Sequence, residues 1–216
     1  MNAKAKDPKR GRCIALGNFK GGVWKTTIAI HLAAHLKAAI IDLDVKQEDS
    51  HRFALHYGLE SYLTNNEEEV FDLVERLVSS GQDVVIDCPP HEGPETQMAV
   101  MIADAVVVPS GPGPHDLYGL GRTMSLVRTV RMDRPDLPMF LVCTEYRRTR
   151  AADAFVASLQ SSTEGQYIGK LWRRVEVADA VEEFRPTWEF RPGSPGAEEM
   201  KNLCTFLDRK VVPYEQ

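Results

Sequence analysis

Short apolar runs alternate along the chain with segments in which apolar residues recur at helical spacing. Such runs are typical of strands buried on both faces of a parallel sheet, and the periodic segments are typical of the helices that cover it. We expect strands over 13–16, 38–43, 83–88, 103–109 and 139–144, and helices over 28–36, 48–57, 68–80, 117–131, 151–159 and from about 195 onward. The Gly- and Pro-rich stretch 110–116 is expected to be a loop. The pattern therefore predicts a three-layer α/β/α fold with a mostly parallel central sheet.

The first predicted strand leads into a glycine-containing loop that opens a helix. This loop reads Lys20-Gly21-Gly22-Val23-Trp24-Lys25-Thr26-Thr27. Such a loop directs several backbone N–H groups into one concavity at the positive end of a helix, which suits a phosphate chain. Lys25 would neutralise the β- and γ-phosphates of a nucleotide, and the Thr26 hydroxyl would hold Mg²⁺. The alternative is a Gly-rich turn with two incidental lysines.

Two residues depart from the ordinary P-loop pattern G-x-x-x-x-G-K-[ST], because Phe19 and Trp24 stand where its glycines belong. The loop instead matches the deviant pattern K-G-G-x-x-K-[ST] in full. If the backbone needs a positive φ at Trp24, a tryptophan there would cost about 1–2 kcal/mol. We then expect weak nucleotide affinity, improved by Trp24→Gly. The alternatives are an ordinary torsion with Trp24 packed beside the loop, or an indole adapted to the site or to a dimer contact.

Carboxylates follow two of the predicted strands. Asp42 and Asp44 end the run from Ala38, and Asp87 ends the run before Cys88-Pro89-Pro90. Because the carboxyl ends of parallel strands gather the chemistry of such sheets, we expect these three side chains near the phosphate loop. The alternative for Asp42 and Asp44 is that they cap the helical segment that follows.

These motifs together resemble the ParA/MinD group of ATPases, and the lead-in Asn18-Phe19-Lys20 resembles ParA-type plasmid partition proteins most. The segments 42–46, 83–90, 103–109 and 168–175 each resemble a further motif of that family, so that the resemblance covers roughly residues 13–207. It implies a P-loop NTPase fold and hydrolysis of ATP with Mg²⁺. The N-terminal DNA-binding domain of the longer ParA proteins is not expected in this chain.

The resemblance also implies individual roles for the site residues. Lys20 would reach the nucleotide of a second copy, so that ATP binding produces a homodimer. Asp44 would orient the attacking water, Asp42 would support the Mg²⁺ region, and Asp87 would hold Mg²⁺ through a bound water. Thr144 stands where relatives have an asparagine that recognises adenine, but a hydroxyl cannot form the amide pair.

The family binds DNA without sequence preference in its ATP dimer and releases it when a small centromere-binding, ParB-like partner stimulates hydrolysis. DNA binding of this kind needs clustered cations that displace counterions from phosphates. Two clusters qualify, and the choice between them stays open: Arg147, Arg148 and Arg150, or Lys170, Arg173 and Arg174. A solvated charged surface is the alternative for both.

The composition limits the classes of function that are possible, but it does not identify what the protein would move in the cell. The net charge of the 216 residues is −5, which excludes a uniformly basic surface. The four cysteines are dispersed without a C-x-x-C pair, as expected for buried thiols in a reducing cytoplasm. Residues 1–11 are predicted to be a basic flexible tail, and residues 12–216 a single ATPase domain. No signal peptide or membrane span is expected, so we predict a cytoplasmic protein, and the resemblance to ParA proteins implies that it associates with the nucleoid.

Three other functions remain open at this stage. A MinD-like protein would need a basic amphipathic C-terminal helix, whereas this chain ends in Val212-Pro213-Tyr214-Glu215-Gln216, so no stable membrane association is expected. A nucleotide-binding scaffold with little hydrolysis is conceivable because of Trp24. A relative that positions a protein body instead of a plasmid would use the same chemistry.

Overall fold

The fold is built on one parallel sheet, with the strand order β3-β2-β4-β1-β5-β6-β7. The computed structural model describes residues 10–214, and every neighbouring pair of strands within that range is parallel. The strands are β1 (Cys13–Leu16), β2 (Ala39–Asp42), β3 (Ser61–Leu63), β4 (Val84–Asp87), β5 (Ala105–Ser110), β6 (Met139–Tyr146) and β7 (Gln166–Trp172). The helices are α1 (Lys25–Leu36), α2 (Asp49–Tyr57), α3 (Glu67–Ser79), α4 (Pro94–Ile102), α5 (Pro114–Val130), α6 (Arg150–Gln160), α7 (Val175–Glu182), α8 (Thr187–Phe190) and α9 (Pro195–Lys210).

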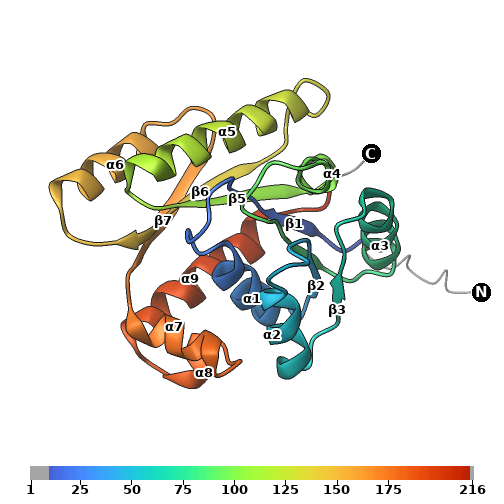
Figure 1. Ribbon diagram of the computed structural model, residues 1–216, viewed down its shortest axis with the longest axis horizontal. Coiled ribbons are helices and arrows are strands. Elements are labelled where there is room, and N and C mark those ends of the chain that lie inside the picture. The colour runs from blue at the N-terminus through green and yellow to red at the C-terminus, as the bar shows by residue number, and fades with distance from the viewer. Residues whose placement is uncertain (1–9, 215–216) are drawn as a thin grey trace, which may run out of the picture.

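Helices cover both faces of the sheet, which gives the predicted three-layer α/β/α architecture (Figure 1). One face packs against α1, α2, α7 and α9 around Ile28, Met200 and Leu207. The other face packs against α3 to α6 in two adjoining clusters. The fold class predicted from the apolar runs is therefore confirmed.

Several element boundaries differ from those expected. The stretch 110–116 is not wholly a loop, because α5 begins at Pro114, where a proline at the first helical position lacks only an N–H that the helix would leave unpaired. Asp116 supports this start by accepting a hydrogen bond from the Gly113 N–H at 3.0 Å. Strand β6 continues two residues past Thr144 to Tyr146. Helix α4 and the edge strand β3 were not expected, since neither carries a clear apolar period.

The start and the end of the described chain both pack against the domain. Residues 1–9 of the predicted tail lie outside the described residues. Arg10, however, forms an ion pair with Asp104 at 2.9 Å, and the Gly11 N–H bonds to the Val78 carbonyl. Arg12, the next residue, forms an ion pair with Asp83. Residues 10 and 11, which the predicted tail included, therefore pack against the domain.

The apolar side of helix α9 packs in the core. Leu203 and Leu207 are buried against α1, and Phe206 packs edge-on to Phe140. These residues are consequently not presented as a membrane-binding face. Within residues 10–214, no helix is long and apolar enough to cross a bilayer. All four cysteines are free and buried, as the sequence predicted.

Candidate active site

Three strand ends bring the predicted site together. In the sheet, Asp87 at the end of β4 is the register partner of Leu16 at the end of β1 and of Asp42 at the end of β2. The chain leaves β1 directly into the loop that precedes α1. The glycine-containing loop and both carboxylates therefore lie at one edge of the sheet, as the parallel arrangement requires.

A pocket of about 250 Å³ opens at this edge, and we call it the loop pocket. Nine predicted site residues line it: Gly21, Gly22, Trp24, Lys25, Thr26, Thr27, Asp42, Asp44 and Asp87. Three predicted residues do not line it. Lys20 lies outside it, Val23 is buried beneath the loop, and Thr144 is fully buried.

The loop takes the left-handed backbone that a P-loop glycine would provide. Gly22 has φ 72°, and Trp24, the N-cap of α1, has φ 67° and ψ 25°. The positive φ considered for Trp24 is thus confirmed, and the alternative of an ordinary torsion is wrong. Gly119 of α5 allows the loop to approach closely, since a Cβ there would lie 2.8 Å from the Lys20 Cβ.

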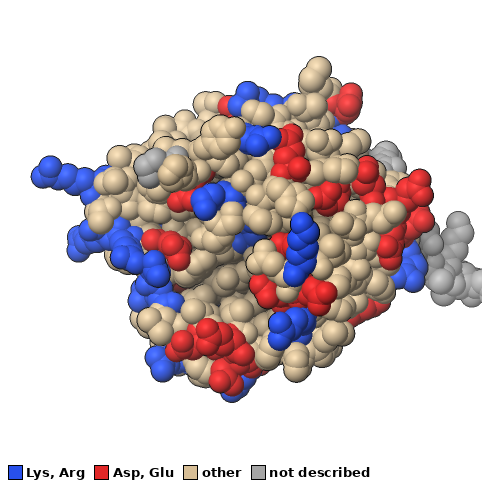
Figure 2. Space-filling model, viewed as in Figure 1, with Lys and Arg blue, Asp and Glu red and all other residues tan. Residues whose placement is uncertain are grey.

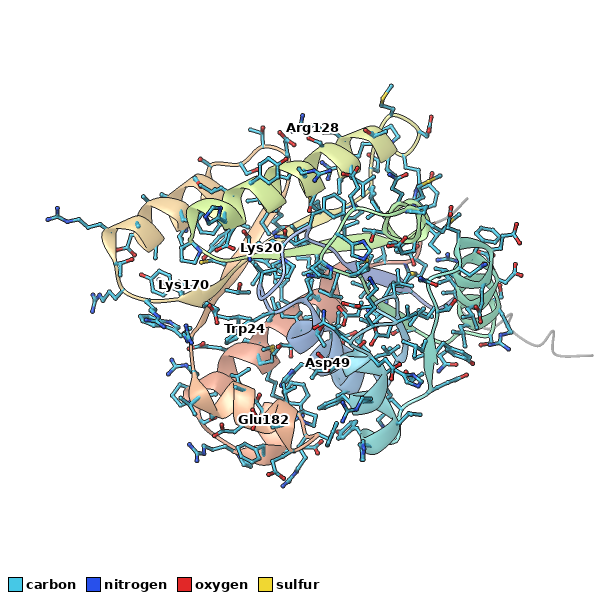
Figure 3. The ribbon with its side chains drawn as sticks, viewed as in Figure 1. Lys20, Trp24, Asp49, Arg128, Lys170 and Glu182 are labelled. Atoms are coloured by element: carbon cyan, nitrogen blue, oxygen red, sulfur yellow. The ribbon has the colours of Figure 1, made fainter. Side chains whose placement is uncertain are left out.

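The two lysines of the loop differ in their surroundings. Lys25 is buried, and its Nζ donates to the Lys20 carbonyl at 2.9 Å. Burial lowers its pKa, although the charges of Asp87 and Asp44 act in the opposite direction. Lys20 is half-buried and its Nζ donates to the Gly21 carbonyl at 3.1 Å. Lys25 is therefore the cation of the loop pocket, whereas Lys20 sits beside it (Figure 3).

Asp42 does cap the next helix, as the alternative interpretation proposed. Its Oδ2 accepts hydrogen bonds from the backbone N–H groups of Ser50 and His51 in the first turn of α2, at 3.1 and 3.0 Å. Its Oδ1 accepts from the Asp44 N–H at 2.9 Å. Burial raises the pKa of Asp42, and these N–H donors partly offset that effect. The side chain both fixes α2 and lines the loop pocket.

Asp87 is buried without a hydrogen-bond partner on Oδ1 within the described chain. Burial, and then the negative charge of Asp42, raises its pKa to about 7, while Thr26 and Lys25 act in the opposite direction. An unpartnered oxygen beside a second carboxylate is the environment that an oxygen-preferring divalent cation suits. Asp87, Asp42 and the Thr26 hydroxyl could therefore hold Mg²⁺.

Asp44 lies at the open side of the pocket, together with residues that the sequence did not single out. Its Oδ2 accepts a hydrogen bond from the Gln47 side chain at 2.8 Å. Gln47 and Asp49 both line the loop pocket, and Asp49 begins α2 (Figure 3). Gln47 lies just outside the segment 42–46 that resembles a family motif, which is why the pattern did not reveal it.

A second pocket, of about 570 Å³, adjoins the first, and we call it the side pocket. Trp24 and Thr27 line both pockets, and Glu145 and Arg173 line the second. The predicted base-contacting residue, Thr144, lines neither pocket. Its hydroxyl donates instead to the Val23 carbonyl at 3.2 Å and so supports the loop from below. No sequence signal distinguished Glu145.

The first basic cluster is exposed at the same edge of the sheet. Arg147 and Arg148 follow β6, Arg150 begins α6, and none of the three has an ion pair within residues 10–214. Lys and Arg atoms gather at the left edge of the molecule in Figure 2, beside the start of α6, while acidic atoms gather below them over α7. Arg147 also lines the side pocket.

The second basic cluster is engaged within the fold. The Lys170 ammonium lies 3.8 Å from the centre of the Tyr146 ring. Arg174 forms an ion pair with Glu199 at 2.6 Å. Arg173 lies 3.9 Å from the Glu145 carboxylate. The structure thus separates two clusters that the sequence could not rank, and the first is the freer one.

The sequence of the chain is related to proteins of known family. A family model described as the CobQ/CobB/MinD/ParA nucleotide binding domain matches residues 14–187. The chain is 28% identical to the chromosome-partitioning ATPase Soj of Thermus thermophilus, over 93% of this chain and 96% of Soj. It is 34% identical to the maintenance of carboxysome distribution protein A of Gloeobacter kilaueensis, over 81% of this chain and 91% of that protein. The chromosome partitioning protein ParA of Myxococcus xanthus is 29% identical over 60% of this chain, a match that spans 62% of that relative's length.

Solved structures have the same fold. MinD of Aquifex aeolicus has a TM-score of 0.74 at 16% identity, covering 95% of this chain and all of that one. A plasmid partition protein of Borrelia burgdorferi bound to AMPPNP has a TM-score of 0.71 at 18% identity, covering 94% of this chain and all of that one. With the family model spanning most of the chain and the deviant loop in place, the protein belongs to the ParA/MinD family of deviant Walker A ATPases.

Proposed function

We propose that this ATPase is a DNA-segregation switch, which forms a homodimer on binding ATP, holds DNA without sequence preference, and is reset when a partner stimulates hydrolysis. One observation carries the proposal. The loop pocket combines the glycine-containing loop, one buried lysine and four carboxylates, and exposed arginines lie at the same edge of the sheet. Nucleotide state and DNA contact can therefore influence each other over a short path.

In this proposal the triphosphate lies along the loop from Gly21 to Thr27. Backbone N–H groups at the start of α1 donate to phosphate oxygens, and Lys25 exchanges its bond to the Lys20 carbonyl for a phosphate oxygen. Asp44, at the open side, orients a water for attack on the γ-phosphate, and ATP and water give ADP and phosphate. Gln47 holds the Asp44 carboxylate in place.

Mg²⁺ fits the donor set that this chain offers. Thr26, Asp42 and Asp87 would hold it, Asp87 through a bound water, and the unpartnered Asp87 Oδ1 is the observation that supports this assignment. When bound, Mg²⁺ would neutralise charge that develops on the phosphates. Burial and the charge of Asp42 raise the pKa of Asp87, so a divalent cation would relieve the repulsion between these two carboxylates.

Lys20 and the exposed face of α5 support the ATP-dependent dimer. Lys20 lies outside the loop pocket of its own chain, which leaves its ammonium able to reach a second copy. Next to it, Leu117 and Tyr118 are 50% and 71% exposed, and Arg122 lies over the Phe19 ring. Apolar and aromatic residues exposed together are typical of a surface that another protein covers.

We assign the DNA contact first to Arg147, Arg148 and Arg150, because their charges are not compensated within residues 10–214. Lys170, Arg173 and Arg174 contribute less, since their cations already face aromatic rings or carboxylates. Exposed cations that displace counterions give binding that ignores sequence and falls with salt.

Two versions of this proposal differ in the cargo that the protein would move. Relatives are named for chromosome partition and for the distribution of carboxysomes. In both versions the switch would travel on nonspecific DNA, and a ParB-like protein or a protein body would be the stimulating partner. A MinD-like cycle on a membrane is less well supported, because the apolar side of α9 lies in the core.

Retention on DNA of random sequence, measured with and without ATP, tests the proposal. We expect retention that requires ATP and is lost in the Lys25→Ala variant. The double variant Arg148→Ala/Arg150→Ala should lose most of the retention, while Arg52→Ala, an exposed arginine on α2, should not. Retention that does not depend on ATP, or that survives in the double variant, would contradict the proposed switch or its DNA contact.

A further inference from the structure

Trp24 forms the wall between two pockets. The loop pocket holds the charged groups suited to phosphates, whereas the side pocket also has apolar lining from Val175, Val177 and Ala178. Of the residues described, only Trp24 and Thr27 line both. A nucleotide whose triphosphate lies along the loop can therefore extend its nucleoside into the side pocket past the indole.

Two strained residues meet at this wall. Trp24 and Glu145 both have positive φ, 67° and 50°, although neither is a glycine. Their side chains are joined, since the indole Nε1 donates to Glu145 Oε1 at 3.3 Å. Non-glycine residues in this region of backbone space each cost free energy, and they persist where the surroundings require them. Strain at two joined residues beside a pocket indicates that they have a functional role there.

The residue expected to read the base is not available for that task. Thr144 is fully buried, and its only side-chain donor is used on the Val23 carbonyl. The next residue, Glu145, points its carboxylate toward Trp24 and Arg173 at the side pocket. The polar group that faces this pocket from the end of β6 is thus a carboxylate.

We propose that Trp24 and Glu145 together recognise the nucleoside end of ATP. The indole face packs against the adenosine, and the Glu145 carboxylate accepts a hydrogen bond from the 6-amino group of adenine. This inference rests on the proposed function, because it requires the triphosphate to lie in the loop pocket. Aromatic rings stack on bases, and carboxylates only accept hydrogen bonds, so the pair suits a base that offers an amino donor.

The contact of Trp24 is measured by the ratio of two affinities, that for ATP and that for inorganic tripolyphosphate, each with Mg²⁺. Relief of backbone strain in Trp24→Gly changes both affinities, so the ratio isolates the contact with the nucleoside. We expect this ratio to fall about tenfold in Trp24→Gly and to fall less in Trp24→Phe, which retains an aromatic face. Lys37→Gly is the matched control, because Lys37 also has a left-handed backbone, φ 55°, but lies at the other end of α1.

The role of Glu145 is measured with purine riboside triphosphate, which lacks the 6-amino group. Wild-type protein should prefer ATP over this analogue about tenfold, and Glu145→Ala should abolish the preference. Glu182→Ala, an exposed glutamate on α7, should leave it unchanged (Figure 3). Both affinities are read by competition with a fluorescent ATP analogue in the first minute after mixing.

The outcomes separate this inference from the proposed function. Tripolyphosphate binding with an unchanged ratio in Trp24→Gly, or a wild-type protein indifferent to the amino group, would overturn the recognition by Trp24 and Glu145 alone. Absence of binding for both ATP and tripolyphosphate would overturn the proposed function and this inference with it.

Discussion

The loop pocket and the side pocket share a wall but are built in different ways. The loop pocket takes its polar groups from a single loop, from the ends of β2 and β4, which the sheet register holds in line, and from the segment that leads into α2. The side pocket takes its residues from the start of α1, the end of β6 and the segment from the end of β7 into α7, three regions far apart in the chain. The loop pocket is thus fixed by one loop and by the sheet register, whereas the side pocket depends on contacts between segments that are distant in the chain.

The largest effect should come from Lys25, the buried cation of the loop pocket. We expect Lys25→Ala to reduce ATP affinity about 100-fold or more, because it removes a charge-assisted hydrogen bond from a buried site. Lys20→Ala should retain most ATP binding but lose the ATP-dependent dimer. Calorimetry measures the first effect, and light scattering with a nonhydrolysable analogue measures the second. If Lys20→Ala still forms a dimer of normal stability with the analogue, Lys20 does not act across the interface.

Replacing Asp44 should lower the rate of ATP hydrolysis without changing the affinity for ATP. Asp44→Ala is expected to lower the hydrolysis rate about 100-fold or more, because an oriented water is lost, and to prolong DNA retention. Gln47→Ala should cause a smaller loss, since it only removes the hydrogen bond that holds Asp44. Asp72→Ala, on the exposed side of α3, is the control. Phosphate release at saturating ATP measures these rates, and normal turnover in Asp44→Ala would assign the water to another residue.

His31 supports the shared wall from beneath, and its titration gives a pH test. Its Nε2 accepts from the Thr187 N–H at 3.0 Å, so Nδ1 carries the proton and donates to the Thr27 carbonyl at 2.6 Å. Burial lowers the pKa of His31 from 6.5 to about 4. The unfolded chain then binds a proton below pH 6.5 that the folded protein does not, so stability falls as the pH falls from 6.5 toward 4.

This contribution should amount to about 2 kcal/mol between pH 7.5 and pH 5. The free energy of unfolding is measured by denaturant titration for the wild type and for His31→Asn at both pH values. Asp87 contributes to the pH dependence in the opposite direction, but equally in the two proteins. The difference between their losses of stability therefore isolates the contribution of His31. The variant should lose about 2 kcal/mol less than the wild type on acidification. Equal losses would mean that His31 is protonated in the folded state.

The smallest effect concerns the salt dependence of DNA binding. Removing Arg148 or Arg150 should reduce the slope of log affinity against log salt by about 0.9 for each DNA phosphate that the variant no longer neutralises. Lys170→Ala should change the slope less, because this ammonium already lies over the Tyr146 ring. An unchanged slope in the arginine variants would move the DNA contact to the second cluster.

The sequence predicted the loop pocket well and the side pocket poorly. The apolar runs placed Asp42 and Asp87 at strand ends, and parallel pairing then brings them to the loop whatever the surrounding residues are. Glu145 could not be found in this way, because its importance arises from a left-handed backbone and from contact with Trp24, 121 positions away in the chain. Likewise, ranking the basic clusters required knowing that Arg174 pairs with Glu199.

One nucleotide should span both pockets, with its phosphates on the loop and its base at Trp24. A crystal structure of the protein with Mg²⁺ and a nonhydrolysable ATP analogue tests this arrangement. We expect β- and γ-phosphates within hydrogen-bond distance of Lys25, and an adenine in contact with the Trp24 indole with its amino group toward Glu145. A nucleotide whose base leaves the loop on the opposite side, with the Trp24–Glu145 bond intact and untouched, would contradict it.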